Sequence, residues 1–107
     1  MPFAPARFMV FAIAAAVVPV SAFAETHTVV IQGFEYKPQT IEVKPGDEVE
    51  FVNRDLLEHT ATASNNAFDS KAIKGGQSWK WKAGQPGQYP YVCSFHGNMK
   101  GVINVKP

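Results

Sequence analysis

Short alternating segments recur along residues 25–107, and no window longer than a few residues shows helical periodicity. Between residues 48 and 53, Val49 and Phe51 alternate with glutamates, which is the two-residue period of a strand with one buried face. Turns rich in Pro and Gly separate these segments, so the sequence predicts an all-β domain, either a sandwich or a barrel. Strands are expected at residues 27–33, 34–36, 40–44, 48–53, 77–82, 87–93 and 101–106. Residues 55–58 and 63–76 are expected to be irregular, with at most one short strand near Phe68.

Residues 1–24 have the features of a secretory signal peptide. Arg7 provides a positive charge, residues 8–18 form an uncharged apolar run, and an Ala-Phe-Ala cleavage signal stands immediately before Glu25. The apolar run is shorter than the ~20 residues that cross a bilayer, which favours cleavage over a retained membrane anchor. Because there is no Arg-Arg pair, the general secretory route is expected. The rest of the chain is then predicted to be one domain in the periplasm, without stable membrane insertion.

The charge and the cysteine content limit the function classes. The chain has ten Lys and Arg against nine Asp and Glu, and loss of Arg7 with the signal peptide leaves a formally neutral domain, which does not indicate binding to nucleic acid or to a membrane surface. A domain this small often needs a disulfide or a metal for stability, and its single cysteine, Cys93, cannot form an internal disulfide. An exported lone cysteine is a hazard unless it is buried or bound, so a metal site is expected.

A cluster of soft metal ligands lies near the C-terminal end of the sequence. Cys93, His96 and Met99 have Cys-x2-His-x2-Met spacing, which places a thiolate, an imidazole and a thioether on one tight loop. A second imidazole completes a set of two His, one Cys and a weakly bound Met, which is typical of a blue-copper electron-transfer site. His59 is the expected fourth ligand, because His27 lies close to the predicted mature N-terminus.

Each of these residues has a simpler interpretation on its own. A single cysteine or methionine is most often a buried core residue, and a single histidine is most often a surface or hydrogen-bonded residue. Zinc also binds Cys and His, but it gains little from a thioether, so the methionine favours copper. A hydrolase could use Cys93 and His96, but a domain this small leaves little room for a substrate pocket, and no orienting acid is evident. We therefore do not expect an enzyme.

The sequence around these ligands resembles the cupredoxins, the small blue-copper proteins, and is most similar to their amicyanin type. The similarity covers nearly all of residues 28–106. The motifs that carry it are, in order, Pro45-Gly46-Asp47-Glu48-Val49, Asn53, His59-Thr60, Gly87-Gln88-Tyr89-x-Tyr91-x-Cys93, and Cys93-Ser94-Phe95-His96-Gly97-Asn98-Met99 followed by Lys100-Gly101-Val102. The resemblance implies a cupredoxin-like Greek-key β-sandwich at residues 25–107 that binds one type 1 copper ion.

The resemblance also implies a role for each ligand. His59 matches the interior histidine, contributed by a segment far from the other three. Cys93 matches the thiolate that forms the short bond to copper, and His96 matches the histidine near the surface. Met99 matches the long axial ligand. Asn53, six residues before His59, matches an asparagine that ties the two ligand-bearing loops together.

The function implied by the resemblance is that of a monomeric carrier of single electrons. Its donor and acceptor would be redox proteins, such as a c-type cytochrome or a dehydrogenase. A periplasmic copper carrier or copper-resistance protein is the alternative. The sequence departs from the amicyanin pattern at Glu58 and Gly97, where proline is usual, and at Asn98, where a larger apolar residue is usual. These residues leave ligation unchanged but predict a more polar and more flexible rim around His96.

The predicted mature N-terminus holds a second combination of metal ligands. A chain that begins Glu25-Thr26-His27 offers an α-amine, two backbone amides and an imidazole, which is a square-planar nitrogen set that suits Cu(II) and Ni(II). The simpler interpretation, which we favour, is that His27 starts the first strand and points to solvent.

Overall fold

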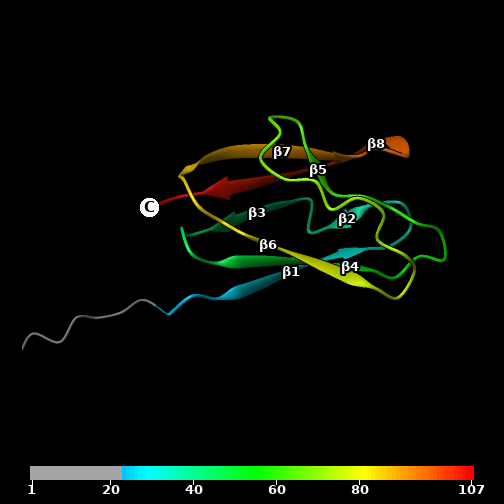
Figure 1. Ribbon diagram of the computed structural model, residues 1–107, viewed down its shortest axis with the longest axis horizontal. Helices are drawn as coiled ribbons and strands as arrows, with labels where there is room; N and C mark the ends of the chain where they lie inside the picture. Colours follow the sequence, from blue (N-terminus) through cyan, green and yellow to red (C-terminus); the bar gives the residue numbers. More distant parts are fainter. Residues whose placement is uncertain (1–22) are drawn as a thin grey trace, which may run out of the picture.

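The computed structural model describes residues 23–107, which form two layers of β-strands (Figure 1). The first sheet has the order β2-β1-β4-β6 and the second has the order β3-β8-β7-β5. The pairs β1–β4 and β3–β8 are parallel, and the other neighbours are antiparallel. The strands are β1 (Thr26–Ile31), β2 (Tyr36–Lys37), β3 (Thr40–Val43), β4 (Glu48–Asn53), β5 (Thr62–Ala63), β6 (Ser78–Lys82), β7 (Gly87–Cys93) and β8 (His96–Val105).

This architecture confirms the predicted all-β sandwich in one small domain. The predicted signal peptide lies, apart from its last two residues, outside the described residues. Within residues 23–107, the structure contains no helix with the length and apolarity needed to cross a bilayer.

The core lies between the sheets and is built from alternate residues of the central strands. In β1 and β4, Val29, Ile31, Val49 and Phe51 are fully buried, while the residues between them are partly exposed. This is the alternation that the sequence predicts. Burying each such side chain contributes roughly 1.5–3 kcal/mol to folding. The second sheet buries Val43, Tyr91, Cys93, Ile103 and Val105 against them.

The last hairpin differs from the sequence-based expectation. β8 begins at His96, whereas the sequence predicted a strand only after Lys100. The register pairs Val92 with Lys100 but Cys93 with His96, so residues 97–99 form a bulge in β8. A bulge interrupts the two-residue alternation of a strand, so the start of β8 could not be recognised from the sequence pattern. The predicted ligand loop is therefore the tip of the β7–β8 hairpin.

The turn between β1 and β2 also differs from the prediction. Phe34 was expected to lie in a strand with Tyr36, but β2 begins at Tyr36 and Phe34 lies in the preceding turn. Its φ is 59°, in the left-handed region that residues other than Gly rarely adopt. The side chain of Phe34 is 41% exposed, so this residue does not belong to the sandwich core.

A close packing contact joins β7 to β8. Tyr91 is almost fully buried, and its ring lies against Gly101, where an added Cβ would overlap the ring and the hydroxyl oxygen. Burial raises the pKa of the Tyr91 hydroxyl well above its ordinary value. Tyr36 packs edge-on against the same ring, with centroids 4.6 Å apart. Glycine at position 101 is thus required by the tyrosine that faces it.

His27 lies in the first strand, as the simpler interpretation predicts, but it does not point freely to solvent, because its side chain is only 27% exposed. His27 lies within β1 and pairs with Val49 of β4. Successive backbone nitrogens of an extended strand point to opposite sides, so the amides of Thr26 and His27 do not converge on one ion. The imidazole Nε2 instead lies 2.9 Å from Oδ2 of Asp47. A square-planar copper site here would require the start of β1 to leave the sheet.

Candidate metal centre

His59 is held by contacts at both nitrogens of its ring. Its backbone forms an isolated bridge with Ile73, and its side chain is fully buried. Nε2 lies 2.8 Å from Oδ2 of Asp55, and Nδ1 lies 3.8 Å from Sγ of Cys93. A carboxylate at Nε2 holds the ring proton there and leaves the lone pair of Nδ1 directed toward the sulfur. The ring is thus oriented to offer Nδ1 as a ligand beside the thiol.

Cys93 is the last residue of β7 and is fully buried. The backbone N–H of Thr60 donates a hydrogen bond to Sγ at 3.3 Å, which fixes the position of the sulfur beside the segment that carries His59. The backbone N–H of Ser94 in turn donates to Oγ1 of Thr60 at 2.8 Å. These two bonds join the segment that carries His59 to the tip of the β7–β8 hairpin.

Asn53 was expected to tie the two ligand-bearing loops together, but its side chain bonds to other segments. Asn53 is fully buried at the end of β4, and its Nδ2 donates to the carbonyl oxygens of Leu57 and Ile73, each at 2.8 Å. Its Oδ1 accepts from the N–H of Asp55 at 2.9 Å. These bonds hold the loop before the buried histidine, and the hairpin that carries the cysteine is held by Thr60 instead.

His96 lies beside His59 at the start of β8 and is partly exposed. The centroids of the two imidazole rings are 5.1 Å apart. The ring of Phe34 lies edge-on to both, with centroids 5.1 Å from His59 and 4.8 Å from His96. A single phenyl ring therefore packs against both predicted imidazole ligands.

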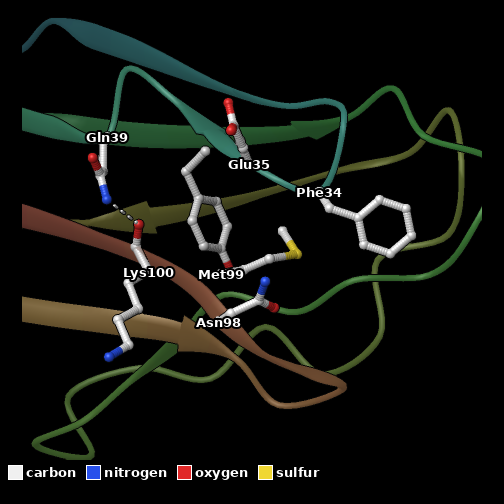
Figure 2. Close-up of a pocket in the computed structure, with 7 residues that line it drawn as sticks. Phe34, Glu35, Gln39, Asn98, Met99 and Lys100 are labelled. Carbon is white, nitrogen blue, oxygen red and sulfur yellow. Dashed lines mark hydrogen bonds between the residues drawn. The ribbon is translucent and has the colours of Figure 1, made fainter.

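Met99 is almost fully buried within the β8 bulge and shares a pocket with Phe34 (Figure 2). Figure 2 shows its sulfur directed toward Phe34, with Asn98 and Lys100 on either side along the chain. Because Phe34 also contacts both histidines, Met99 lies at the same end of the sandwich as the other predicted ligands. The bulge turns this side chain inward at a point where regular alternation is interrupted.

Asp55 is a site residue that the sequence analysis did not identify. Its Oδ1 accepts the N–H of Gly33 at 2.8 Å, and its Oδ2 accepts the N–H of Phe34 at 3.0 Å in addition to contacting His59. Burial raises the pKa of Asp55, but the hydrogen bonds from Phe34, Gly33 and His59 lower it, and the net pKa lies below the ordinary value. The carboxylate thus ties the β1–β2 turn to the buried imidazole.

The same carboxylate accounts for the strained backbone of Phe34. A left-handed conformation at a residue other than Gly costs of order 1–3 kcal/mol and persists only where its surroundings enforce it. Here two consecutive N–H groups, from Gly33 and Phe34, converge on Asp55. The turn places the phenyl ring over the histidines, and neither Asp55 nor Phe34 belongs to a motif that marks this role in the sequence.

The donor set fits copper on chemical grounds. Among residues 23–107, no group of three or more His, Cys, Asp and Glu side chains is arranged to hold a metal ion, so the donor set includes a methionine. The pair that is already in contact is His59 with Cys93, and His96 and Met99 lie at the same end. Two imidazoles, a thiolate and a thioether suit both Cu(I) and Cu(II), whereas a closed zinc site uses a fourth nitrogen, sulfur anion or carboxylate.

Comparison with known proteins identifies the family. Residues 5–105 match the family model described as a cupredoxin-like domain, and the chain belongs to this family. It is 26% identical to amicyanin-alpha of Methylorubrum extorquens over 81 residues, covering 71% of this chain and 68% of that protein. The resemblance to the amicyanin type of cupredoxin is thus confirmed.

Two solved structures place the fold in the same family. An oxidised amicyanin mutant superimposes with a TM-score of 0.71 and 26% identity, covering 76% of this chain and 82% of that one. A copper-containing nitrite reductase from Thermus scotoductus gives a TM-score of 0.72 and 27% identity, covering 89% of this chain. This chain spans only 25% of the nitrite reductase chain, so the likeness concerns one domain of that enzyme.

Proposed function

We propose that this protein is a type 1 copper protein that carries single electrons between redox partners by cycling between Cu(II) and Cu(I). The observation that supports this most directly is the buried contact of His59 Nδ1 with Cys93 Sγ, with the N–H of Thr60 donating to the same sulfur. This combination presents a nitrogen and a sulfur donor in a site that excludes water. Membership of the cupredoxin family supports copper as the metal.

The proposed ligands are His59, Cys93, His96 and Met99. The copper ion, when bound, supplies the one-electron change. Asp55 keeps the proton of the first imidazole on Nε2 and so fixes which nitrogen is offered. Because these residues are held by the sandwich and its hairpin, little rearrangement accompanies a change of oxidation state.

We propose that partners dock at the end of the domain that carries the metal site. His96 is the partly exposed ligand, and four large apolar side chains are exposed on the segments around it. Gly97 and Asn98 are exposed as expected, so the rim combines polar and apolar groups. The apolar residues are Phe34, Leu56, Leu57 and Phe95. A c-type cytochrome or a dehydrogenase is the proposed class of partner, and the carrier itself is proposed to act as a monomer.

The proposed location is the periplasm, reached through the general secretory route with cleavage before Glu25. We propose no catalytic activity, because the proposed task of accepting and donating one electron needs no substrate pocket. The copper-containing nitrite reductase that resembles this chain is a much longer protein, so its activity is not carried over to a single domain.

A visible absorption spectrum of the copper-loaded protein tests this proposal. We expect an intense thiolate-to-copper band that the Cys93→Ser variant lacks, while Ser94→Ala, at the neighbouring exposed position, keeps it. Repeated oxidation and reduction should retain the copper. Loss of Cu(I) on each cycle would favour a copper carrier instead. A colourless copper-loaded protein, or a Cys93→Ser variant as strongly coloured as the unmodified one, would rule out the blue-copper site.

A further inference from the structure

Among residues 23–107, Glu25 is the first whose backbone N–H and carbonyl oxygen both form hydrogen bonds. Its N–H donates to Oδ1 of Asp47 at 3.0 Å, and its carbonyl oxygen accepts the N–H of Glu48 at 2.8 Å. The two described residues before it, Phe23 and Ala24, are exposed. Within residues 23–107, the backbone hydrogen bonds therefore begin at the residue before which cleavage of the signal peptide is proposed.

The buried carboxylate of Asp47 is contacted by nitrogen atoms of three residues, Glu25, Lys44 and His27. It is 5% exposed, and besides Glu25 it accepts the N–H of Lys44 at 3.0 Å and contacts Nε2 of His27 at 2.9 Å, both through Oδ2. The hydrogen bonds from Glu25, then Lys44, then His27 lower the pKa of Asp47 to about 2. The carboxylate is therefore negatively charged at neutral pH.

We propose that Asp47 is the binding site for the α-ammonium group that forms when the chain is cut before Glu25, an inference that rests on the cleavage proposed above. Hydrolysis by a peptidase adds water across the amide between Ala24 and Glu25. The carboxylate formed at Ala24 leaves with the signal peptide, and the nitrogen of Glu25 remains as an ammonium group. The nitrogen already lies at hydrogen-bonding distance, so no atom of the fold has to move.

The chemical change at this nitrogen strengthens an existing contact. An amide offers one neutral N–H, whereas an ammonium offers three N–H groups and a positive charge. Hydrogen bonds between charged groups are roughly twice as strong as neutral ones, and the low exposure of Asp47 reduces screening by water. The Glu25 carbonyl bond to Glu48 keeps the ammonium in place, because it fixes the same residue from the other side. Removal of the signal peptide is thus expected to stabilise the domain.

Other charged groups surround Asp47 and contribute to the electrostatic potential at the nitrogen of Glu25. Lys106 forms an ion pair with Glu42 at 2.8 Å, so those two charges largely offset each other. The side chain of Glu25 is a second anion near the ammonium. The imidazole of His27 contacts the same carboxylate and competes with the ammonium for it. The charged and titratable residues that line the cavity are Glu25, His27, Glu42, Lys44, Asp47 and Lys106.

The proposal gives a defined dependence on pH. An α-amine has an ordinary pKa of about 8, and pairing with a carboxylate raises it in the folded state. Stabilisation from the pair is then fully present below about pH 8 and is lost as the pH rises through the raised value. A rise of about one pKa unit corresponds to a tenfold change in the folding equilibrium constant.

The test compares two copper-loaded chains that differ only at the start, one beginning at Glu25 and one beginning at Phe23. Selective ¹⁵N labelling of Glu25 allows NMR to follow the α-amine directly. We expect its pKa to lie about one unit or more above 8 in the shorter chain, and to return to about 8 in its Asp47→Asn variant. Asp69→Asn, which changes a carboxylate of an exposed loop, should leave the raised value unchanged.

Denaturant unfolding of the same two chains provides a second readout that needs no substitution. The folding constant of the shorter chain should exceed that of the longer chain by about tenfold at pH 7, and the two should converge near pH 10.5, because lysines and tyrosines titrate equally in both. An α-amine with a pKa of about 8 in the folded protein would overturn the proposal. A ratio of folding constants that is the same at pH 7 and pH 10.5 would also overturn it.

Discussion

Replacing Asp55 with alanine removes the carboxylate that accepts hydrogen bonds from His59, Gly33 and Phe34. The Nε2–H of His59 is fully buried, and leaving it without an acceptor costs about 1–3 kcal/mol. The N–H groups of Gly33 and Phe34 are exposed, so each lost bond there costs about 0.5–1.5 kcal/mol. Relaxation of the left-handed backbone at Phe34 returns about 1 kcal/mol. We expect Asp55→Ala to lower the free energy of unfolding by about 1–5 kcal/mol.

Urea unfolding of the metal-free protein measures this loss without a contribution from copper binding. Asp55→Asn keeps an acceptor for the histidine and should lose less stability than Asp55→Ala. The control is Asp69→Ala, because Asp69 also accepts backbone and side-chain hydrogen bonds but serves no buried donor. Its loss should stay below about 1 kcal/mol. Equal losses for Asp55→Ala and Asp69→Ala would show that the buried imidazole does not depend on this carboxylate.

Three further predictions follow from other contacts. Gly101→Ala should cost about 1–3 kcal/mol in urea unfolding, because its Cβ overlaps the ring of Tyr91, whereas Gly84→Ala, with open space around its Cβ, should be tolerated. Met99→Leu should keep copper but raise the reduction potential, because loss of the axial donor disfavours Cu(II); unchanged voltammetry would make Met99 a packing residue. Asp47 has a folded pKa of about 2, so the stabilisation it provides should be complete above about pH 4 and lost as the pH falls toward 2, and Asp47→Asn should remove this dependence.

The strands and the ligand-bearing hairpin could be predicted because their signals are local. Alternation in β4 identifies its buried face, since every second side chain of a strand points the same way. Cys93 and His96 are close in sequence and remain neighbours across the hairpin turn in any fold that keeps β7. The start of β8 could not be predicted, because the bulge at residues 97–99 interrupts the pattern on which the prediction depends.

The sequence by itself determined the donor types, their spacing and the periodicity that makes two sheets. Only the tertiary structure decided which groups surround those donors. The backbone N–H of Thr60 donates a hydrogen bond to the sulfur of Cys93, which is 33 residues away in the sequence. Every residue except proline carries a backbone N–H, so the residue type at position 60 does not reveal this contact. Asp55 likewise accepts a backbone N–H, that of Gly33, from 22 residues away, and the residue type of the donor does not reveal this contact either. Such contacts depend on how β1, β4 and the β7–β8 hairpin come together, which no local pattern records.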